Sequence, residues 1–370
     1  MEGQTFNRRF PSVFRLNHRR NVRKITLLKA CMKIFPLLFA SLLAAAAAFA
    51  ASPAKVTDVV MESYNGWSDC LVMRGGDCRA VVAPAVGGRV MSYTVNGENI
   101  LLENTNTWGR TLANTPGGFW AGGYQCDVGP ELRGLSDHKA LWIGPWGWRV
   151  PRPFTVHTFS EPELALGVQL DKEFVIDPDT GDLGVTQRMR NIISNDVSFC
   201  LWDRTLCKGG GFALFPLNKK SRFKTGWSIR QGSNAPSYRY EGGNPADARV
   251  RVMEGVLVAE ARSLPRTPEL KIGADSDAGW IAYARGRVLF VKYFPVFPGQ
   301  NYSDGGNTVE FYCTERVAEL EPLSPEITLK PGGTYVFPEK WTLFDLADEV
   351  TTHEKARALV KMIPKSPFAK

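Results

Sequence analysis

Residues 167–191 read GVQLDKEFVIDPDTGDLGVTQRMRN, and this stretch shows the pattern that decides the fold class. Apolar and polar side chains alternate over 167–176 and again over 183–191, and Pro178 and Gly181 lie between the two runs. Alternation with a period of two residues is typical of strands that bury one face. The stretch therefore predicts two β-strands joined by a turn.

Similar short strands fill most of residues 55–345, where Gly, Pro and Asn mark the breaks between them. Further predicted strands are 78–95, 250–261, 280–293, 308–313 and 327–337. Apolar residues at helical spacing occur in the tail, over 346–363. No linker or low-complexity segment interrupts the chain. The sequence therefore predicts a single all-β domain over 51–370, with a short C-terminal helix.

The first 50 residues have the features of a secretory leader. Met32-Lys33 precedes an uncharged run over 34–50 that is rich in Leu and Ala and ends in Ala-Phe-Ala. A basic start, an apolar core and small residues at the end are typical of a signal peptide with a cleavage site. The sequence thus predicts an exported protein, periplasmic or extracellular, with no membrane span after the leader is removed.

Two alternatives concern this leader. Residues 1–31 make it unusually long, and a true start at Met32 is preferred to a genuine extension. An uncleaved anchor over 34–54 is the alternative to removal, since that run is barely long enough to span a bilayer. The Ala-Phe-Ala triplet and Pro53 favour cleavage.

The net charge of the whole chain misleads about its partners. The 370 residues include 45 Lys and Arg against 37 Asp and Glu, a formal charge of +8. Nine of the basic residues and one of the acidic residues lie in residues 1–33, so 36 of each remain in the rest of the chain. A neutral body gives no electrostatic reason to expect nucleic acid as a partner.

Export makes the cysteines informative, because thiols oxidise outside the cytoplasm. An even number follows the leader, which permits up to three disulfides, and free thiols are the alternative. Residues 74–77 predict a hairpin turn, in which a Gly75-Gly76 loop would pair Cys78 with Met73. The spacings do not resemble a zinc site, so no metal or cofactor is predicted. The six cysteines are Cys70, Cys78, Cys126, Cys200, Cys207 and Cys313.

Aromatic residues gather in two glycine-rich stretches, over 108–124 and over 142–148. Flat rings with a polar edge suit the C–H faces of sugars, and glycines let backbone approach a ligand. Core packing is the alternative for each Trp, and for any single Trp it is the preferred interpretation.

The C-terminal third contains a set of distinctive segments: 290–294 (FVKYF), 302–312 (YSDGGNTVEFY), 318–325 (AELEPLSP), 329–332 (LKPG) and 339–343 (EKWTL). These segments resemble an uncharacterised bacterial family of the galactose mutarotase-like superfamily. Weaker matches reach back to residues 87–89, so the resemblance covers nearly the whole chain after the leader. It implies a β-supersandwich of two large antiparallel sheets with a concave sugar-binding face.

The resemblance also implies a catalytic base. Aldose 1-epimerases of this superfamily use a strand glutamate that precedes a Lys/Arg-Pro-Gly turn by about twenty residues, and Glu310 precedes Pro331 in this way. A carboxylate can take the anomeric hydroxyl proton as the sugar ring opens. The alternative is a structural carboxylate paired with Lys292 or Arg204.

The superfamily also uses histidine as an acid, and here the resemblance is incomplete. Residues 200–205 match the strand that carries this histidine, but they place Arg204 at its position. Arginine stays protonated, so it can bind hydroxyls or a carboxylate but cannot act as a general acid. His138 falls near the position of the other catalytic histidine, and a loop histidine without a catalytic role is the alternative.

Together these patterns predict an exported protein that binds, and if an enzyme isomerises, a mono- or oligosaccharide in an epimerase-like cleft. The alternative is a non-catalytic glycan-binding protein or a structural cell-envelope protein. Glu319 and Glu321 share one strand face by their spacing, and the preferred interpretation is that they face solvent or pair with Lys and Arg. The alternative is a carboxylate pair for a retaining-type glycoside mechanism or for a cation. Oligomeric state and sugar identity stay open. The predicted catalytic residues are Glu310 and His138, and the predicted substrate-binding residues are Arg204, Lys292, Gln125, Trp142 and Asp203.

Overall fold

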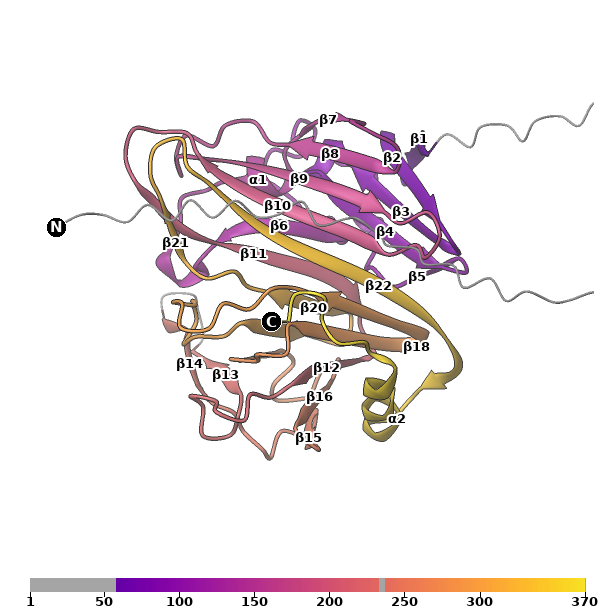
Figure 1. Ribbon diagram of the computed structural model, residues 1–370, viewed down its shortest axis with the longest axis vertical. Coiled ribbons are helices and arrows are strands. Elements are labelled where there is room, and N and C mark those ends of the chain that lie inside the picture. Colours follow the sequence, from indigo (N-terminus) through magenta and orange to yellow (C-terminus); the bar gives the residue numbers. More distant parts are fainter. Residues whose placement is uncertain (1–57, 233–236, 370) are drawn as a thin grey trace, which may run out of the picture. The chain divides into compact units, whose positions relative to one another are not determined.

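A computed structural model of the protein describes residues 58–232 and 237–369 (Figure 1). The predicted leader over 1–50, its cleavage site and the start at Met32 lie outside the described residues. The described chain is built from two large sheets, and every strand pairing in them is antiparallel. The predicted all-β supersandwich is therefore confirmed.

The larger sheet has thirteen strands within the described residues. Its order is β1-β2-β3-β4-β6-β11-β20-β19-β17-β13-β14, with β5 beside β4 and β21 beside β11. The strands are β1 (Val59–Tyr64), β2 (Trp67–Gly75), β3 (Cys78–Ala83), β4 (Arg89–Val95), β5 (Glu98–Asn99), β6 (Tyr124–Gly129), β11 (Val197–Lys208), β13 (Ser228–Gln231), β14 (Arg239–Gly242), β17 (Leu270–Ala274), β19 (Val309–Cys313), β20 (Val317–Pro322) and β21 (Ile327–Leu329).

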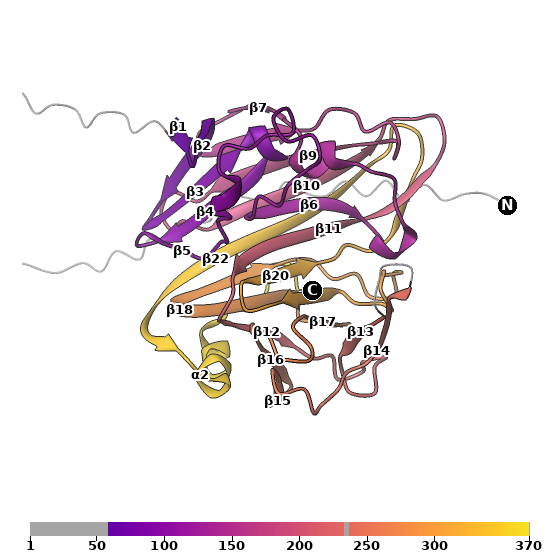
Figure 2. The same ribbon diagram turned by 180° about the vertical axis from the view of Figure 1, so that it is seen from behind.

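The smaller sheet has nine strands in the same part of the chain, in the order β15-β16-β12-β18-β22-β10-β9-β8-β7. Both sheets can be followed from the opposite side in Figure 2. The strands are β7 (Gly147–Arg149), β8 (Thr155–Phe159), β9 (Val168–Ile176), β10 (Leu183–Asn191), β12 (Phe212–Pro216), β15 (Val250–Met253), β16 (Val256–Glu260), β18 (Trp280–Tyr293) and β22 (Thr334–Val350).

Short helices lie between and after the strands. The tail packs Ala356 of α2 with β12, β16 and β18 on the outer face of the smaller sheet. No helix in the described residues has both the length and the apolar character needed to cross a membrane. The helices are α1 (Lys139–Ile143) and α2 (His353–Ala358), with 3-10 turns η1 (Pro84–Val86), η2 (Thr105–Thr107), η3 (Glu131–Arg133) and η5 (Leu359–Met362).

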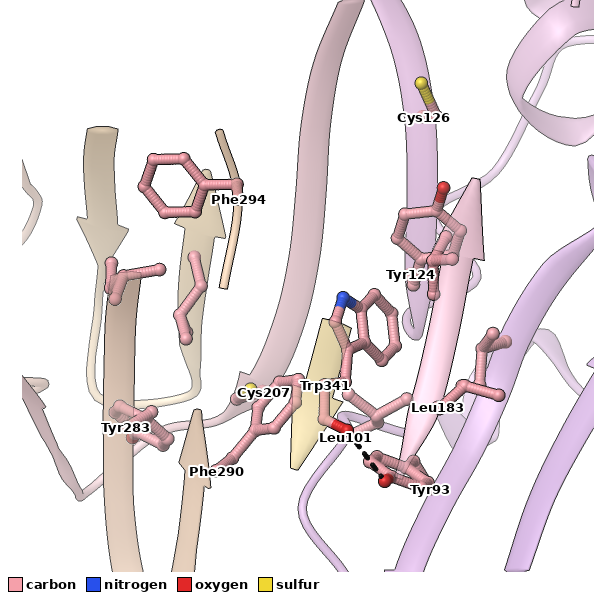
Figure 3. Packing of buried hydrophobic residues seen from close by; sticks show 14 of the residues in the cluster. Tyr93, Leu101, Tyr124, Cys126, Leu183, Cys207, Tyr283, Phe290, Phe294 and Trp341 are labelled. Carbon is pink, nitrogen blue, oxygen red and sulfur yellow. Dashed lines mark hydrogen bonds between the residues drawn. The ribbon is translucent and has the colours of Figure 1, made fainter. Parts of the chain in front are cut away.

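The main core lies between the two sheets and explains the alternation in the sequence. Buried and half-buried residues alternate along β9 and β10, and the buried ones face the larger sheet. Tyr124 of β6 and Trp341 of β22 meet edge to face across the core, with ring centroids 5.0 Å apart (Figure 3). Fully burying each such apolar side chain contributes roughly 1.5–3 kcal/mol, so the alternating pattern fixes which face of each strand is inside.

The predicted strand bounds agree closely where a strand is long and regular. The strands predicted over 183–191 and 280–293 are β10 and β18, and the one predicted over 167–176 is β9. The run 78–95 is instead two strands, because Pro84 begins η1 and has no N–H for a ladder. The runs 250–261 and 327–337 likewise each divide between two strands.

The tail prediction was too long. The helix expected over 346–363 is α2 followed by η5, because β22 continues to Val350 and pairs there with Gly286 of β18. Thr352 then caps α2, and its hydroxyl accepts a hydrogen bond from the Lys355 N–H. Packing against β18 therefore outweighs the local helical pattern before residue 352.

The hairpin between β2 and β3 differs by two residues from the predicted register. Cys78 pairs with Gly75 rather than with Met73, and the loop is Gly76-Asp77. The backbone of Asp177 lies against Gly75, and a Cβ there would lie 2.0 Å from the Asp177 carbonyl oxygen, so only glycine fits at this strand position. All six cysteines in the described chain are buried, free thiols.

Candidate functional site

Strand β11 divides the predicted site residues between the two faces of the larger sheet. Successive side chains on a strand point to opposite faces. Asp203 points into the sandwich, where it contacts Lys292 of β18. Arg204 points outward, and 22% of its side chain is exposed. The sequence prediction had placed these three residues in one cleft, which the alternation of the strand does not allow.

The inward group, here called the interior cluster, consists of Lys292, Asp203, Thr205 and Glu339. Lys292 Nζ is paired with Asp203 Oδ1, lies 2.7 Å from Thr205 Oγ1 and lies 3.3 Å from Glu339 Oε2. The charged side chains have no exposed surface. Burial and the charge of Glu339 raise the pKa of Asp203 well above its ordinary value. A sugar has no route to this cluster in this structure, so Lys292 and Asp203 act within the core.

The outward group, here called the outer-face cluster, lies where β11, β20, β19 and β17 run side by side. Glu310 of β19 and Glu321 of β20 are direct cross-strand partners. Lys271 of β17 forms an ion pair with each of them: its Nζ lies 2.9 Å from Glu310 Oε2 and also contacts Glu321 Oε2. The cluster comprises Glu131, Arg204, Lys271, Glu310, Glu319 and Glu321.

Glu310 has hydrogen bonds on both carboxylate oxygens and no exposed surface. The Asn307 side-chain amide donates to Oε1 at 2.9 Å, and the Tyr240 hydroxyl donates to Oε2 at 3.0 Å. Its ion-pair partner is Lys271, so the predicted alternatives Lys292 and Arg204 were wrong. The buried carboxylate thus contacts three polar side chains, those of Asn307, Tyr240 and Lys271.

Trp202 of β11 forms the floor of the outer-face cluster. Its indole N–H donates to Glu321 Oε2 at 2.7 Å. The cations of Arg204 and Lys271 lie 5.1 and 5.4 Å from its ring centroid, within the range of cation–π attraction. Gly129 of β6 makes room for this ring, since a Cβ there would lie 2.4 Å from the Trp202 ring.

The exposed side of the cluster is formed by Arg204, Glu131 and Glu319. Arg204 Nη2 lies 3.8 Å from Glu131 Oε1, and 38% of the Glu131 side chain is exposed. Glu319 is half-buried and shares the outward face of β20 with Glu321. These three side chains are therefore the part of the cluster that a dissolved ligand reaches first.

Carboxyl groups outnumber cations here, and this shifts their pKa values upward. Burial and the neighbouring Glu321 raise the pKa of Glu319 to about 7. Burial also raises the pKa of Glu310, and the opposing charge of Lys271 does not fully compensate. Asp304, in the turn before β19, has its pKa raised to about 8 by burial and by Glu310. The group therefore holds carboxyl protons close to neutral pH, which acid–base chemistry requires.

His138 lies beside the same face, just before α1. Its Nε2 lies 2.8 Å from Asp127 Oδ1 of β6, and 14% of its side chain is exposed. Burial opposes its charge, but the hydrogen bond and the charge of Asp127 outweigh burial and raise the pKa of His138 to about 9. Arg204 is also close enough to Asp127 to lower the pKa of that carboxyl. The imidazolium is therefore the stable form at neutral pH.

Gln125 and Trp142 support the backbone around this face. Arg89, fully buried on β4, donates to Gln125 Oε1 and to the Trp142 carbonyl oxygen. Gln125 is itself buried and is the cross-strand partner of Arg204. The Trp142 ring packs half-buried against the cluster of apolar side chains around Trp67. In this structure both residues accept hydrogen bonds from Arg89, and the Trp142 ring also packs against buried apolar side chains.

Sequence reasoning missed four residues of the site: Lys271, Trp202, Tyr240 and Glu131. The alternation in Leu270–Ala274 marks Lys271 as the opposite face from its apolar neighbours, so its orientation was within reach. Its ion-pair partner could not be predicted, because the strand order brings β17 beside β19, which lies nearly forty residues further along the chain. Trp202 was a visible neighbour of Arg204 but was not singled out.

Comparison with known proteins supports the fold. No protein-family model matches the chain, and no curated protein matches it. A galactose mutarotase-like protein from Lactobacillus casei ATCC 334 aligns with a TM-score of 0.52, 12% identity, 74% of this chain and 100% of its own. A galactose mutarotase related enzyme from Lactobacillus acidophilus aligns with a TM-score of 0.51 and 10% sequence identity, and the alignment covers 76% of this chain and 100% of that protein. The chain thus has the galactose mutarotase-like fold that its sequence predicted.

Proposed function

We propose that the chain is an exported carbohydrate-binding protein, and that it binds a mono- or oligosaccharide through the outer-face cluster. The observation that carries the proposal is the meeting of Arg204, Glu131 and Glu319 at the surface, above Trp202. Guanidinium and carboxylate groups form strong hydrogen bonds with hydroxyl groups. The fold, which is shared with proteins named for galactose mutarotase, supports a sugar as the ligand.

The binding test compares two arginines that differ in place but not in chemistry. Arg204→Ala removes the partly exposed cation of the cluster, and Arg74→Ala removes a cation on β2 that pairs with Glu62 of β1. Calorimetric titration with neutral and acidic monosaccharides should show at least about a tenfold weaker affinity for Arg204→Ala, because a charge-assisted contact is worth ~1.5–3 kcal/mol. Equal affinities in the two variants would show that the outer-face cluster is not part of the binding site.

Export is proposed from the leader alone. Expression of the full chain in a bacterium, followed by fractionation and N-terminal sequencing, should give a protein outside the cytoplasm that begins near Ala51. A cytoplasmic protein that retains residues 34–50 would contradict export and leave the binding proposal standing.

A second candidate function is an epimerase-like proton transfer, favoured by the raised pKa values of Glu319 and His138. Polarimetry of fresh α-glucose and α-galactose tests it in the wild type, Glu310→Gln and Glu319→Gln. A loss of rate in Glu310→Gln assigns the base to Glu310 and requires Tyr240 to move aside. A loss in Glu319→Gln alone assigns the base to the half-buried carboxyl of Glu319. No rate above that of buffer leaves a binding protein.

A further inference from the structure

Strands β7, β8, β9 and β10 lie side by side in the smaller sheet (Figure 1). Their outer face carries a second group of charged residues. The buried residues of these strands face the core, so the alternate residues point away from the larger sheet. A hollow of about 300 Å³ lies among them, and a second of about 430 Å³ adjoins it. Small-molecule sites begin at roughly 300 Å³. The first hollow is lined by Arg149, His157, Phe159, Gln169, Asp171 and Arg190.

The acidic residues in these hollows are already occupied. Asp171 accepts a hydrogen bond from Arg188 Nη1 at 2.8 Å, and Glu173 accepts two from Arg152 at 3.1 and 3.3 Å. Arg188 and Arg152 are therefore neutralised by protein carboxylates. Asp171 also contacts the ring of His157.

Two arginines of the first hollow have no such partner. Arg190 of β10 is exposed, and its side chain has no hydrogen bond or ion pair with any described residue. Arg149 of β7 bonds through Nε alone, which leaves the N–H groups of Nη1 and Nη2 free among the described residues. The hollow therefore keeps two positive charges that no carboxylate of the described chain offsets.

His157 holds the Arg149 side chain in place. Arg149 Nε always carries a hydrogen, so it donates to His157 Nδ1 at 3.0 Å. Nδ1 is then the unprotonated nitrogen, and Nε2–H donates to Asp171 Oδ1 at 2.9 Å. The chain Arg149–His157–Asp171 fixes the guanidinium at the edge of the hollow without neutralising it. Phe159, 37% exposed, adds an apolar wall beside His157.

We propose that this hollow binds the oxyanion group of a small molecule, a carboxylate, sulfate or phosphate, between Arg149 and Arg190. Guanidinium groups present paired N–H donors that match such oxygens, and free cations on both sides favour an anion over a neutral ligand. This site lies on the sheet opposite the outer-face cluster, so it does not depend on the proposed sugar function.

The test uses three probes, inorganic phosphate, sulfate and glucuronate, with glucose as the neutral reference, in titrations at constant ionic strength. Arg149→Ala and Arg190→Ala should each weaken the binding of at least one anion about three- to fivefold, and the double variant should abolish it. Arg190 has no structural contact to lose, so its variant should fold normally. Arg152→Ala is the matched control, since Glu173 already neutralises Arg152.

Each outcome decides the proposal. Whichever probe binds, with the expected loss in Arg190→Ala and less than about a twofold change in Arg152→Ala, supports the site and identifies its oxyanion. The proposal is overturned when no probe binds the wild type at about 20 mM, or when the double variant binds as tightly as the wild type. An equal loss in Arg152→Ala would indicate a diffuse surface attraction and overturn it as well.

Discussion

The interior cluster and the outer-face cluster are built alike and differ in access. Each holds a lysine against two carboxylates: Lys292 with Asp203 and Glu339, and Lys271 with Glu310 and Glu321. The first is sealed between the sheets, whereas the second continues to the surface through Arg204. The same ionic pattern is therefore enclosed on one face of the sheet and reaches solvent on the other.

The largest effect should come from removing the cation of the interior cluster. Lys292→Met leaves Asp203 and Glu339 buried without a cation, and breaking a buried pair in this way costs about 3–5 kcal/mol of unfolding free energy. Urea denaturation measures it. Lys340→Met is the control, because Lys340 pairs with Asp182 at the surface and should cost less than ~1 kcal/mol. Similar losses of unfolding free energy in both variants would contradict the larger cost expected for breaking a buried ion pair than a surface one.

A second interior lysine should behave in the opposite way. Lys172 contacts the Gly87 carbonyl oxygen and two aromatic rings instead of a carboxylate, and burial lowers its pKa to about 7. Between pH 7 and about 10.5 this lysine binds more protons in the unfolded chain than in the folded protein. The free energy of unfolding therefore rises with pH across this window. Lys172→Met should stabilise the protein by about 1–3 kcal/mol at pH 7 and flatten that rise.

Urea titrations of both proteins at pH 7, 8.5 and 10 measure the effect, and the difference between them removes the contribution of other titrating groups. A Lys172→Met variant that is less stable at every pH would mean that the hydrogen bond to Gly87 outweighs the cost of burying the charge.

A smaller effect is expected at His138, which is partly exposed beside the outer-face cluster. Because its folded pKa is raised to about 9, its stabilisation is complete below pH 6.5 and is lost as the pH rises through 9. The pKa of Asp127 is lowered, so the stabilisation that its ionised carboxylate provides is lost only in acid. His138→Gln should remove about 1–3 kcal/mol at pH 6 and little at pH 10. A pH-independent loss in the thermal unfolding profile would show a purely packing role.

The smallest effect should occur at a fully accessible pair. Lys330, 81% exposed, pairs with Asp196 at 2.6 Å near the turn before β22. Lys330→Ala should change the unfolding free energy by less than ~0.5 kcal/mol, since exposed pairs are screened by water. A loss larger than that of His138→Gln would contradict the expectation that an exposed ion pair contributes less stability than a partly buried one.

Much of the fold was predictable because strand alternation is a local property. The bounds of β10 and β18 follow from their own residues, whereas the tail failed where β22 pairs with β18 beyond the local pattern. The candidate site was predictable only in part. Arg204, Glu310 and His138 lie on or beside the outer face of the larger sheet. Strand alternation places Asp203, the neighbour of Arg204, on the inner face.

Local sequence was enough to predict most strands, the face on which each strand side chain lies, and the fold that the chain resembles. The pairing of Glu310 with Lys271 and the position of Lys292 between the sheets became visible only in the folded chain. Side-chain alternation depends on adjacent residues, whereas an ion pair depends on which strands become neighbours, and that is set by the packing of the whole sandwich.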